Sequence, residues 1–382
     1  MIIELHLIQN FAPANLNRDD TGSPKDCEFG GHRRARISSQ CFKRAVRSFM
    51  RDAELVPSEL LGVRTKLLVD EIAGRLSKRS LDPVTARSVA AKALEGAGVT
   101  LEKDKAAALV FVSQRDLAAL TDLCETYWEP LAARAAAAAA KKPSEKLATN
   151  ISSALRSALD SGGAVDLALF GRMLASAPDI NVDGACQVAH AISTNRVSME
   201  FDFYSAVDEL QGAEQTGAGM LGTIEFNSSC FYRYANLDTD QLSKNLRGDV
   251  ELARLAQDAF VTAFARAVPS SKQRSMAAPN PPSLVMAVAR NGQAMSLANA
   301  FIRPARATRD HDLVQASISA LAGYWDRLQK MYGKTGIVGA WAVSTEDPES
   351  CGDPTWTWVP SLDRINAELG AAAWGLPAAA VS

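Results

Sequence analysis

The sequence has few residues of the kinds that build metal centres, disulfide frameworks or membrane spans. Its 382 residues include six cysteines and four histidines, and neither type shows CxxC or HxxxH spacing. We therefore expect no structural metal, no cofactor and no disulfide, as is typical of a protein of the reducing cytoplasm. The start of the chain lacks a basic segment followed by a long apolar run, so we expect neither a signal peptide nor a membrane span.

Motifs of common enzyme classes are also missing. The sequence contains no P-loop, no dinucleotide-binding fingerprint and no visible Ser/His/Asp set. One loop carries Asp19, Asp20 and Asp26, and paired carboxylates can hold Mg²⁺ for phosphodiester cleavage. The same residues equally suit a turn in which carboxylates accept backbone amides or pair with Arg18. We expect a protein that is not an enzyme, with a metal-dependent ribonuclease as the alternative.

Positive charge is unevenly distributed along the chain. In total, 41 Lys and Arg face 43 Asp and Glu, which gives a formal net charge of −2. Residues 33–51 nonetheless contain seven Lys or Arg and no acidic residue. Such a local concentration on a slightly acidic chain predicts a polyanionic partner.

The basic segment predicts an amphipathic helix that begins at Ser38 or Ser39. Phe42, Val46 and Phe49 recur at three- and four-residue spacing and form its apolar stripe. Hydrogen-bonding and basic side chains occupy the opposite face of the helical wheel, namely Gln40, Lys43, Arg44, Arg47 and Arg51. Taken alone, such a face is also compatible with a simple solvated surface.

The residues that enter this helix favour an anion-binding surface. Gly30 and Gly31 are followed by Arg33, Arg34 and Arg36, and the first amides of a helix themselves attract anions. Backbone amides, serine hydroxyls and guanidinium groups that converge on one place predict a site for phosphates.

Periodicity divides the rest of the chain into strands and helices. Alternation predicts strands at 2–11 and 221–237, strand character returns at 188–197, and the apolar run at 283–290 predicts a buried strand. Helical patterns cover 54–177, 239–267 and 312–331. The alanine-rich run at 132–142 suits a plain helical linker. The order of elements is that of βαββαβ ferredoxin-like and RNA-recognition sheets, so we predict an α+β fold.

Seven blocks of the sequence together resemble a known family. They match, in order and along nearly the whole chain, the CasC family, which is the backbone subunit of the type I-E CRISPR surveillance complex Cascade. The blocks are LNRDD (16–20), FGGHRRARISSQCFKRA (29–45), AHAISTNRV (189–197), FYSAVDEL (203–210), LGTIEFNSSCFYRYANL (221–237), KQR (272–274) and SLANAF (296–301). The likeness is weakest in the alanine-rich region, at the tip of the expected thumb and after Gly370.

The resemblance implies an α+β fold shaped like a right hand. An RNA-recognition-motif-like (ferredoxin-like) palm would carry a large helical finger insertion and a protruding thumb hairpin. The finger domain corresponds to 55–180 and the thumb to 194–222, and the palm corresponds to 1–54, 181–193 and 223–382.

The resemblance also implies a role in antiviral defence. Copies of such a subunit stack head to tail along a guide crRNA and grip its sugar-phosphate backbone, while the thumb of a neighbour wedges between bases. The guide pairs with target DNA, other Cascade subunits complete the ribonucleoprotein, and a recruited helicase-nuclease cuts the target. A stand-alone RNA-binding protein is the plainer alternative that the residues leave open.

Binding residues carry over from the family one by one. By resemblance, the guide backbone is contacted by Arg18, Lys25, Ser38, Gln40, Lys43, Arg44, Arg47, Lys272, Gln273 and Arg274. Met173 is similar to a methionine that lies against displaced bases, although a core helix position is an alternative. Lys141, Lys142 and Lys146 resemble lysines that hold DNA. His32 stands where a lysine is common, which removes a standing charge near neutral pH.

Overall fold

The computed structural model describes the chain apart from residues 142–145, 160–161, 175–176, 207–219, 352–353 and 376–382. The protein has a mixed α+β fold, as predicted, and divides into two compact units. The sheet unit comprises Met1–Asp52, Gln187–Leu237 and Asp258–Ser382, and the helical unit comprises Ala53–Cys186 and Asp238–Gln257. Within the described residues, no helix combines the length and apolarity that a membrane span needs.

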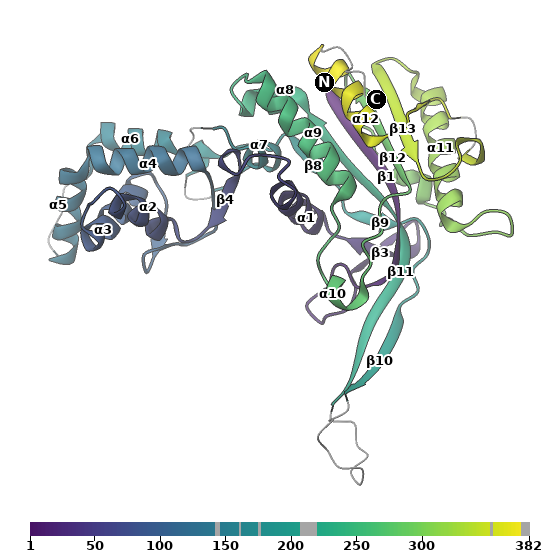
Figure 1. Ribbon diagram of the computed structural model, residues 1–382, viewed down its shortest axis with the longest axis horizontal. Helices are drawn as coiled ribbons and strands as arrows, with labels where there is room; N and C mark the ends of the chain where they lie inside the picture. The colour runs from purple at the N-terminus through teal and green to yellow at the C-terminus, as the bar shows by residue number, and fades with distance from the viewer. Residues whose placement is uncertain (142–145, 160–161, 175–176, 207–219, 352–353, 376–382) are drawn as a thin grey trace, which may run out of the picture. The chain divides into compact units, whose positions relative to one another are not determined.

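A ten-stranded sheet forms the centre of the sheet unit (Figure 1). Its main path has the strand order β14-β13-β12-β1-β11-β9-β3-β2, and β8 and β10 pair with β11. The strands are β1 (Ile2–Ala14), β2 (Asp26–Phe29), β3 (His32–Ile37), β8 (Cys186–Val188), β9 (Ala191–Ser193), β10 (Glu200–Ala206), β11 (Met220–Asp238), β12 (Leu284–Arg290), β13 (Ile337–Ser344) and β14 (Thr357–Trp358). The four predicted strands are confirmed as β1, β9, β11 and β12.

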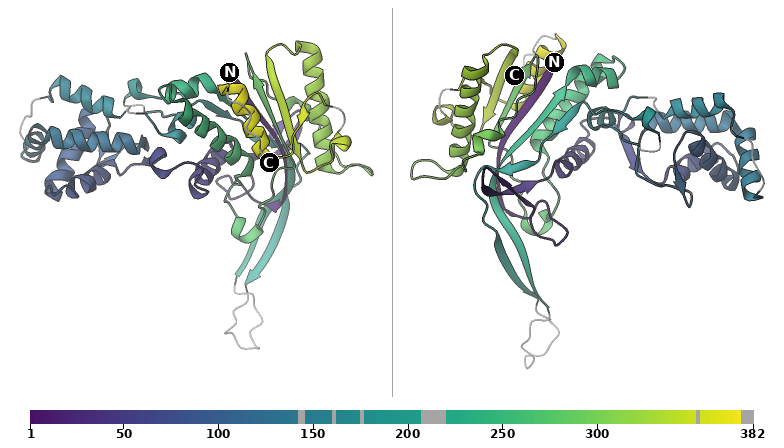
Figure 2. Two further views of the ribbon diagram at one scale, coloured as in Figure 1. Left: turned by 45° about the horizontal axis from the view of Figure 1, so that its top comes forward. Right: turned by 180° about the vertical axis from the view of Figure 1, so that it is seen from behind.

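Helices cover both faces of this sheet (Figure 2). The face that carries Ile8 opposite Leu284 packs against α11 (Leu313–Tyr332), the predicted helix at 312–331. On the other face lie α12 (Leu362–Trp374), which contacts β12 and β13, and the second half of α9 (Val250–Arg266). The core of the sheet unit therefore consists of two apolar layers, one on each side of the strands.

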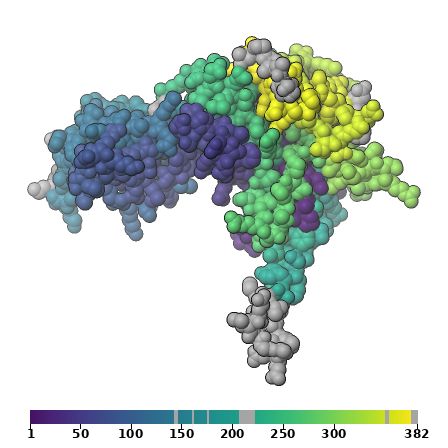
Figure 3. All heavy atoms as spheres, viewed as in Figure 1, coloured from purple at the N-terminus to yellow at the C-terminus, as the bar shows by residue number. Residues whose placement is uncertain are grey.

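Strands β10 and β11 form a projecting hairpin at the end of the sheet (Figure 3). The Tyr204 ring lies over Gly222, where any side chain would collide with it. Phe201 and Phe203 are 66% and 67% exposed. The predicted thumb is thus a hairpin in its described part, and its remaining residues, 207–219, lie outside the described chain.

A second hairpin precedes the basic helix, where the sequence predicted only a segment that leads into the helix. Gly30 and Gly31, at φ +61° and +73°, form the turn between β2 and β3. The three arginines that follow were predicted only as residues that enter the helix, and in the structure they lie on strand β3. Helix α1 then spans Ser39–Asp52, which confirms the predicted helix.

The helical unit is mainly α-helical, as predicted for 54–177. Its helices are α2 (Leu68–Ser77), α3 (Pro83–Gly96), α4 (Gln114–Thr126), α5 (Trp128–Ala139), α6 (Thr149–Ala158), α7 (Val165–Phe170) and α8 (Thr239–Asn245). Short strands pair between them, β4 (Gly62–Thr65) with β7 (Val110–Ser113) and β5 (Leu101–Glu102) with β6 (Lys105–Ala106). Small and branched apolar side chains from these helices form a core of their own.

Several elements differ from the prediction. The helix predicted over 239–267 is interrupted between α8 and α9, because Arg247 (φ 58°) and Gly248 (φ 79°) adopt left-handed conformations. Residues 238–257 belong to the helical unit, whereas the sequence assigned them to the palm. The segment 268–282, which lies between the predicted helix at 239–267 and the predicted strand at 283–290, contains the short helix α10 (Gln273–Met276). The elements β13, β14 and α12 were not predicted.

Candidate nucleic-acid interface

Helix α1 buries one side and exposes the other, as its sequence predicts. Phe42, Val46 and Met50 are fully buried. Phe49, which the prediction placed in the apolar stripe, is only half-buried, because the helix contacts its own unit through the side that carries Met50. The opposite side presents exposed Gln40, Arg44 and Arg51 and half-buried Lys43 and Arg47.

A buried arginine attaches α1 to the sheet. The Arg233 guanidinium of β11 lies 4.1 Å from the centroid of the Phe42 ring and 4.6 Å from that of Phe264. It donates to Gln9 Oε1 at 2.5 Å and also to the Phe264 carbonyl oxygen. Burial lowers the pKa of Arg233 to about 9, so it stays charged at neutral pH. A stacked and hydrogen-bonded cation thus supports the apolar side of α1.

The start of α1 is tied to the loop that follows β1. Ser38 Oγ accepts a hydrogen bond from the Cys41 amide at 3.3 Å, which identifies Ser38 as the capping residue. The Ser38 amide donates to Asn17 Oδ1 at 2.8 Å. Loop 16–22 is therefore held beside the helix, and Arg18 at its surface is exposed.

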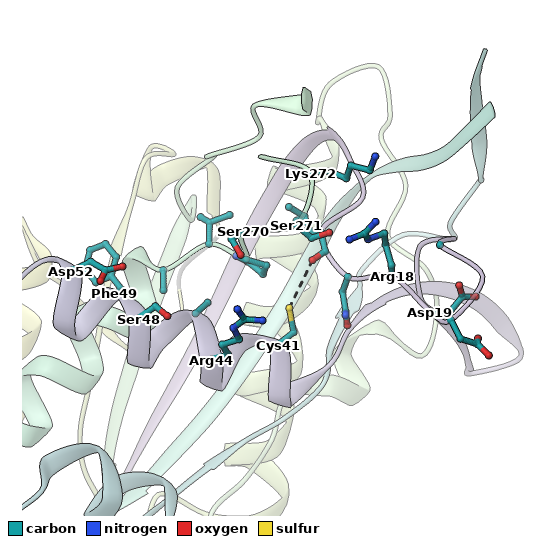
Figure 4. Close-up of a pocket in the computed structure, with 18 of the residues that line it drawn as sticks. Arg18, Asp19, Cys41, Arg44, Ser48, Phe49, Asp52, Ser270, Ser271 and Lys272 are labelled. Atoms are coloured by element: carbon teal, nitrogen blue, oxygen red, sulfur yellow. Dashed lines mark hydrogen bonds between the residues drawn. The ribbon is translucent and has the colours of Figure 1, made fainter. Parts of the chain in front are cut away.

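An open groove of about 1030 Å³ runs beside α1 (Figure 4). Three segments line it, the loop 16–22, one flank of α1 and the loop 267–272. Of the predicted basic face of α1, only Arg44 lies on that flank, whereas Gln40, Lys43 and Arg47 lie outside the lining. Figure 4 shows the Arg18 and Lys272 side chains near each other at one end, with Arg44 further along the helix. The groove therefore gathers cations from three separate parts of the chain.

The cations of this groove lack acidic partners. Among the residues that the structure describes, no carboxylate forms an ion pair with Arg18, Arg44 or Lys272. In the helical unit, by contrast, Arg79 and Arg156 bind carboxylates at 2.6 Å and 3.2 Å. The lining also includes Asp19, Asp20 and Asp52, and basic groups that form no ion pair stay available to bind phosphates.

The loop 268–282 is held in a strained conformation that presents Lys272. The backbone of Lys272 lies in the left-handed region at φ 56°, which is uncommon for a residue with a side chain. The Gln273 side chain accepts from the Ala278 amide at 2.9 Å and donates to the Pro269 carbonyl at 3.2 Å. Gln273 thus shapes the loop, while Arg274 beside it is exposed.

The aspartates next to the groove have local partners. Asp19 Oδ1 accepts the amides of Thr21 and Ser23 at 2.9 Å and 3.0 Å, and hydrogen bonding, first from the Thr21 hydroxyl, lowers its pKa. Asp26 forms an ion pair with Arg33. The turn interpretation is confirmed for Asp19. Across the described part of the chain, no three His, Cys, Asp or Glu side chains gather as metal ligands would.

One arginine of the basic segment faces inward. Arg34 is fully buried and donates to the carbonyl oxygens of Ser193 at 3.1 Å, Thr194 at 2.7 Å and Phe301 at 2.5 Å. From the sequence, Arg34 was predicted to be one of the anion-binding groups. Because its two terminal nitrogens, Nη1 and Nη2, donate to carbonyl groups, Arg34 instead fastens the end of β9 and the segment at 301 to β3.

Other predicted residues lie in the helical unit. Met173 is 85% exposed and follows the end of α7, where Gly171 at φ 75° turns the chain. The core helix alternative for Met173 is therefore wrong. Lys141 and Lys146 are exposed, and Lys142 lies outside the described residues.

The structure also exposes three basic residues that were not predicted from the sequence as candidate binding residues. Arg303, Arg306 and Arg309 follow one another along a segment between Phe301 and α11 of the sheet unit, and all three are exposed. Small residues separate them, so they form no run of charge that draws attention in the sequence. Their spacing of three residues was the available signal.

Comparisons with known proteins match almost the whole chain. A family model described as "CT1975-like protein" matches residues 3–357. A chain from a solved structure described as "CRISPR RNA-guided surveillance complex, pre-nicking" is 32% identical with a TM-score of 0.85, and the match covers 98% of this chain and 100% of that one. A chain from a second such complex is 26% identical with a TM-score of 0.73, covering 96% and 100%. No curated protein matches the chain.

Proposed function

This chain belongs to the family of CT1975-like proteins and is similar to chains of CRISPR RNA-guided surveillance complexes, and from that premise we propose that it is the backbone subunit of a type I-E Cascade complex. Several copies coat a guide crRNA, stack head to tail along it and present its bases to target DNA. The subunit has no catalytic activity, and a helicase-nuclease recruited in the cytoplasm cuts the target.

The groove beside α1 is the observation that carries this proposal. Arg18, Arg44 and Lys272 line it without described acidic partners. Guanidinium and ammonium groups bind phosphates through charge-assisted hydrogen bonds, and an open groove leaves the bases of the bound strand accessible. Such a protein reads the backbone while base pairing reads the sequence, as in other RNA-guided effectors.

The fold supports the same assignment. Strands β12, β1, β11 and β9 lie side by side in that order. They are the fourth, first, third and second strands of the predicted βαββαβ order, which is the arrangement of a ferredoxin-like sheet. We assign the palm to the sheet unit, the thumb to the β10–β11 hairpin and the finger to the helical unit, where Met173 would meet displaced bases and Lys141 and Lys146 would meet DNA.

Replacing one basic residue of α1 at a time tests the proposal. Arg44 lines the groove, whereas Arg51, equally exposed on the same helix, does not. We expect Arg44→Ala to weaken binding of any single-stranded RNA about three- to tenfold and to reduce the salt dependence by about 0.7 counterions, the release expected for one phosphate contact. Arg51→Ala should change both quantities much less. Fluorescence anisotropy over a range of salt concentrations measures them.

Two results would contradict the assignment. Wild-type affinity that does not change with salt concentration excludes a backbone-binding groove. A preference for one RNA sequence over another of equal length indicates base reading, which the coating role does not require.

The ribonuclease alternative has less support, because Asp19 and Asp26 already bind backbone amides and Arg33. An assembled complex incubated with complementary labelled RNA and Mg²⁺ separates the two functions. Intact RNA agrees with the coating subunit, whereas cleavage that Asp26→Ala abolishes would establish the nuclease.

A further inference from the structure

A histidine outside the predicted binding set lies at the start of α1. His190 precedes β9 and is exposed. Its Nδ1 lies 3.3 Å from Arg36 Nη1 and 3.4 Å from the Ser39 amide nitrogen. An N–H group donates in both contacts, so Nδ1 is the acceptor and carries no proton. The neutral imidazole thus occupies donors that would otherwise be available to a ligand at this place.

The charges that act on His190 are positive. Partial burial lowers the pKa of His190, and the charges of Arg36 on β3 and of Lys25 in the segment before β2 lower it further. Asp26 of β2, the carboxylate on the neighbouring strand, pairs with Arg33 and offers Arg36 only its backbone carbonyl, at 3.1 Å. Three basic groups therefore meet here, and the two permanent cations add to partial burial in opposing protonation of the imidazole.

A phosphate at this position would reverse that balance. Its oxygens are stronger acceptors than a neutral imidazole for the Arg36 guanidinium and the Ser39 amide. Its negative charge also offsets the repulsion that Lys25 and Arg36 exert on a protonated His190. A protonated ring no longer accepts hydrogen bonds and instead donates from both nitrogens. Phosphate binding and protonation of His190 therefore favour each other.

We propose that His190 couples guide binding to proton uptake: when a backbone phosphate reaches Arg36 and the Ser39 amide, His190 takes up a proton and donates to that phosphate. This inference rests on the proposed function, because the phosphate belongs to the bound RNA. His190 is a positioning residue in the unbound protein, where it orients Arg36, and a direct phosphate partner in the complex.

Binding measured as a function of pH tests the coupling. With fluorescein-labelled oligouridine at constant ionic strength, wild-type affinity should rise about three- to tenfold between about pH 8 and about pH 6. His190→Asn keeps a neutral acceptor for Arg36 but does not titrate. Its affinity should match that of the wild type within about twofold near pH 8 and stay nearly constant as the pH falls. His311→Asn, in the segment before α11, is the control and should keep the full pH dependence.

Histidine-selective NMR of the complete chain provides a second readout, since the chain has four histidines. The pKa of His190 should rise when oligouridine is added, and it should not rise with an uncharged nucleoside. A pH dependence that persists in His190→Asn, or a His190 pKa that RNA leaves unchanged, overturns the coupling while salt-dependent binding still supports the proposed function. Absence of RNA binding at every pH overturns both.

Discussion

Arginine serves two opposite purposes in the sheet unit, and local sequence does not separate them. Arg34 and Arg233 are buried and donate to carbonyl or amide oxygens from distant segments, whereas Arg18 and Arg44 are exposed on the groove. The difference depends on which acceptors and rings the fold brings to each guanidinium. A basic run therefore predicts an anion-binding surface without telling which of its members form it.

Removal of Arg233 should destabilise the protein strongly. In Arg233→Leu, the Gln9 side chain and the Phe264 carbonyl lose their donor inside the core, which costs about 2 to 4 kcal/mol of unfolding free energy. Arg303→Leu changes an exposed arginine instead and should stay within about 0.5 kcal/mol of the wild type. Chemical denaturation of both variants measures the difference. Similar small losses for the two would mean that Arg233 does not support α1.

A buried histidine predicts how stability depends on pH. His6 Nδ1 contacts the Tyr232 hydroxyl at 2.8 Å, and burial lowers the pKa of His6 from 6.5 to about 3. The unfolded chain therefore binds this proton first, and the contribution of His6 to stability is lost as the pH falls from about 6.5 toward 3. By about pH 5 the loss should reach about 2 kcal/mol.

His6→Asn isolates this effect, because asparagine can accept from the Tyr232 hydroxyl and does not titrate. Burial raises the pKa of the Glu4 carboxyl, which acts in the opposite sense on acidification, so only the difference between wild type and variant is informative. Denaturant unfolding at about pH 7 and about pH 5 should show the smaller loss in the variant. Equal losses would mean that His6 titrates normally in the folded protein.

Among the elements, those with a clear period were predictable and short ones were not. Helix α1 follows its pattern because it buries one regular set of side chains, and β1 and β12 are strands buried on both faces. The β2–β3 hairpin was not predicted, although Gly30 and Gly31 separate two short runs as the residues of a two-residue turn do. The basic residues of β3 were instead interpreted together with the helix that follows. Pairs such as β5 and β6 are too short to show any period.

The two turn glycines offer a matched pair of substitutions. Both have positive φ, but a side chain at Gly30 would collide with the Ile302 carbonyl, whereas Gly31 has no atom within 4 Å of the added position. Gly31→Ala should cost about 1 kcal/mol from backbone strain alone. Gly30→Ala should cost about 1 to 3 kcal/mol more, because the segment at 301–302 must move. Thermal unfolding compares them, and equal costs would contradict the close approach.

At the scale of the whole molecule, the sequence and the structure contributed different parts of the site. Helical periodicity gave the exposed face of α1, and the family resemblance supplied Arg18 and Lys272. Neither showed that these residues line one groove, because the loop 16–22, α1 and the loop 267–272 meet only through folding. The roles of Gln273 and Arg34 depend on hydrogen bonds to carbonyl oxygens that no sequence pattern reveals.

A coating subunit should assemble cooperatively on RNA, which a stand-alone binder does not. A projecting hairpin with exposed Phe201 and Phe203 buries neither ring within its own unit, and in a head-to-tail stack it would reach the strand held by the next copy. Mass photometry with limiting protein on long single-stranded RNA should therefore show fully coated and bare RNA with few intermediates. Phe203→Ser should abolish this cooperativity while leaving the affinity for a short RNA nearly unchanged, because the groove at α1 is intact. Independent filling by the wild-type protein, with intermediates in binomial proportion, would favour the stand-alone binder.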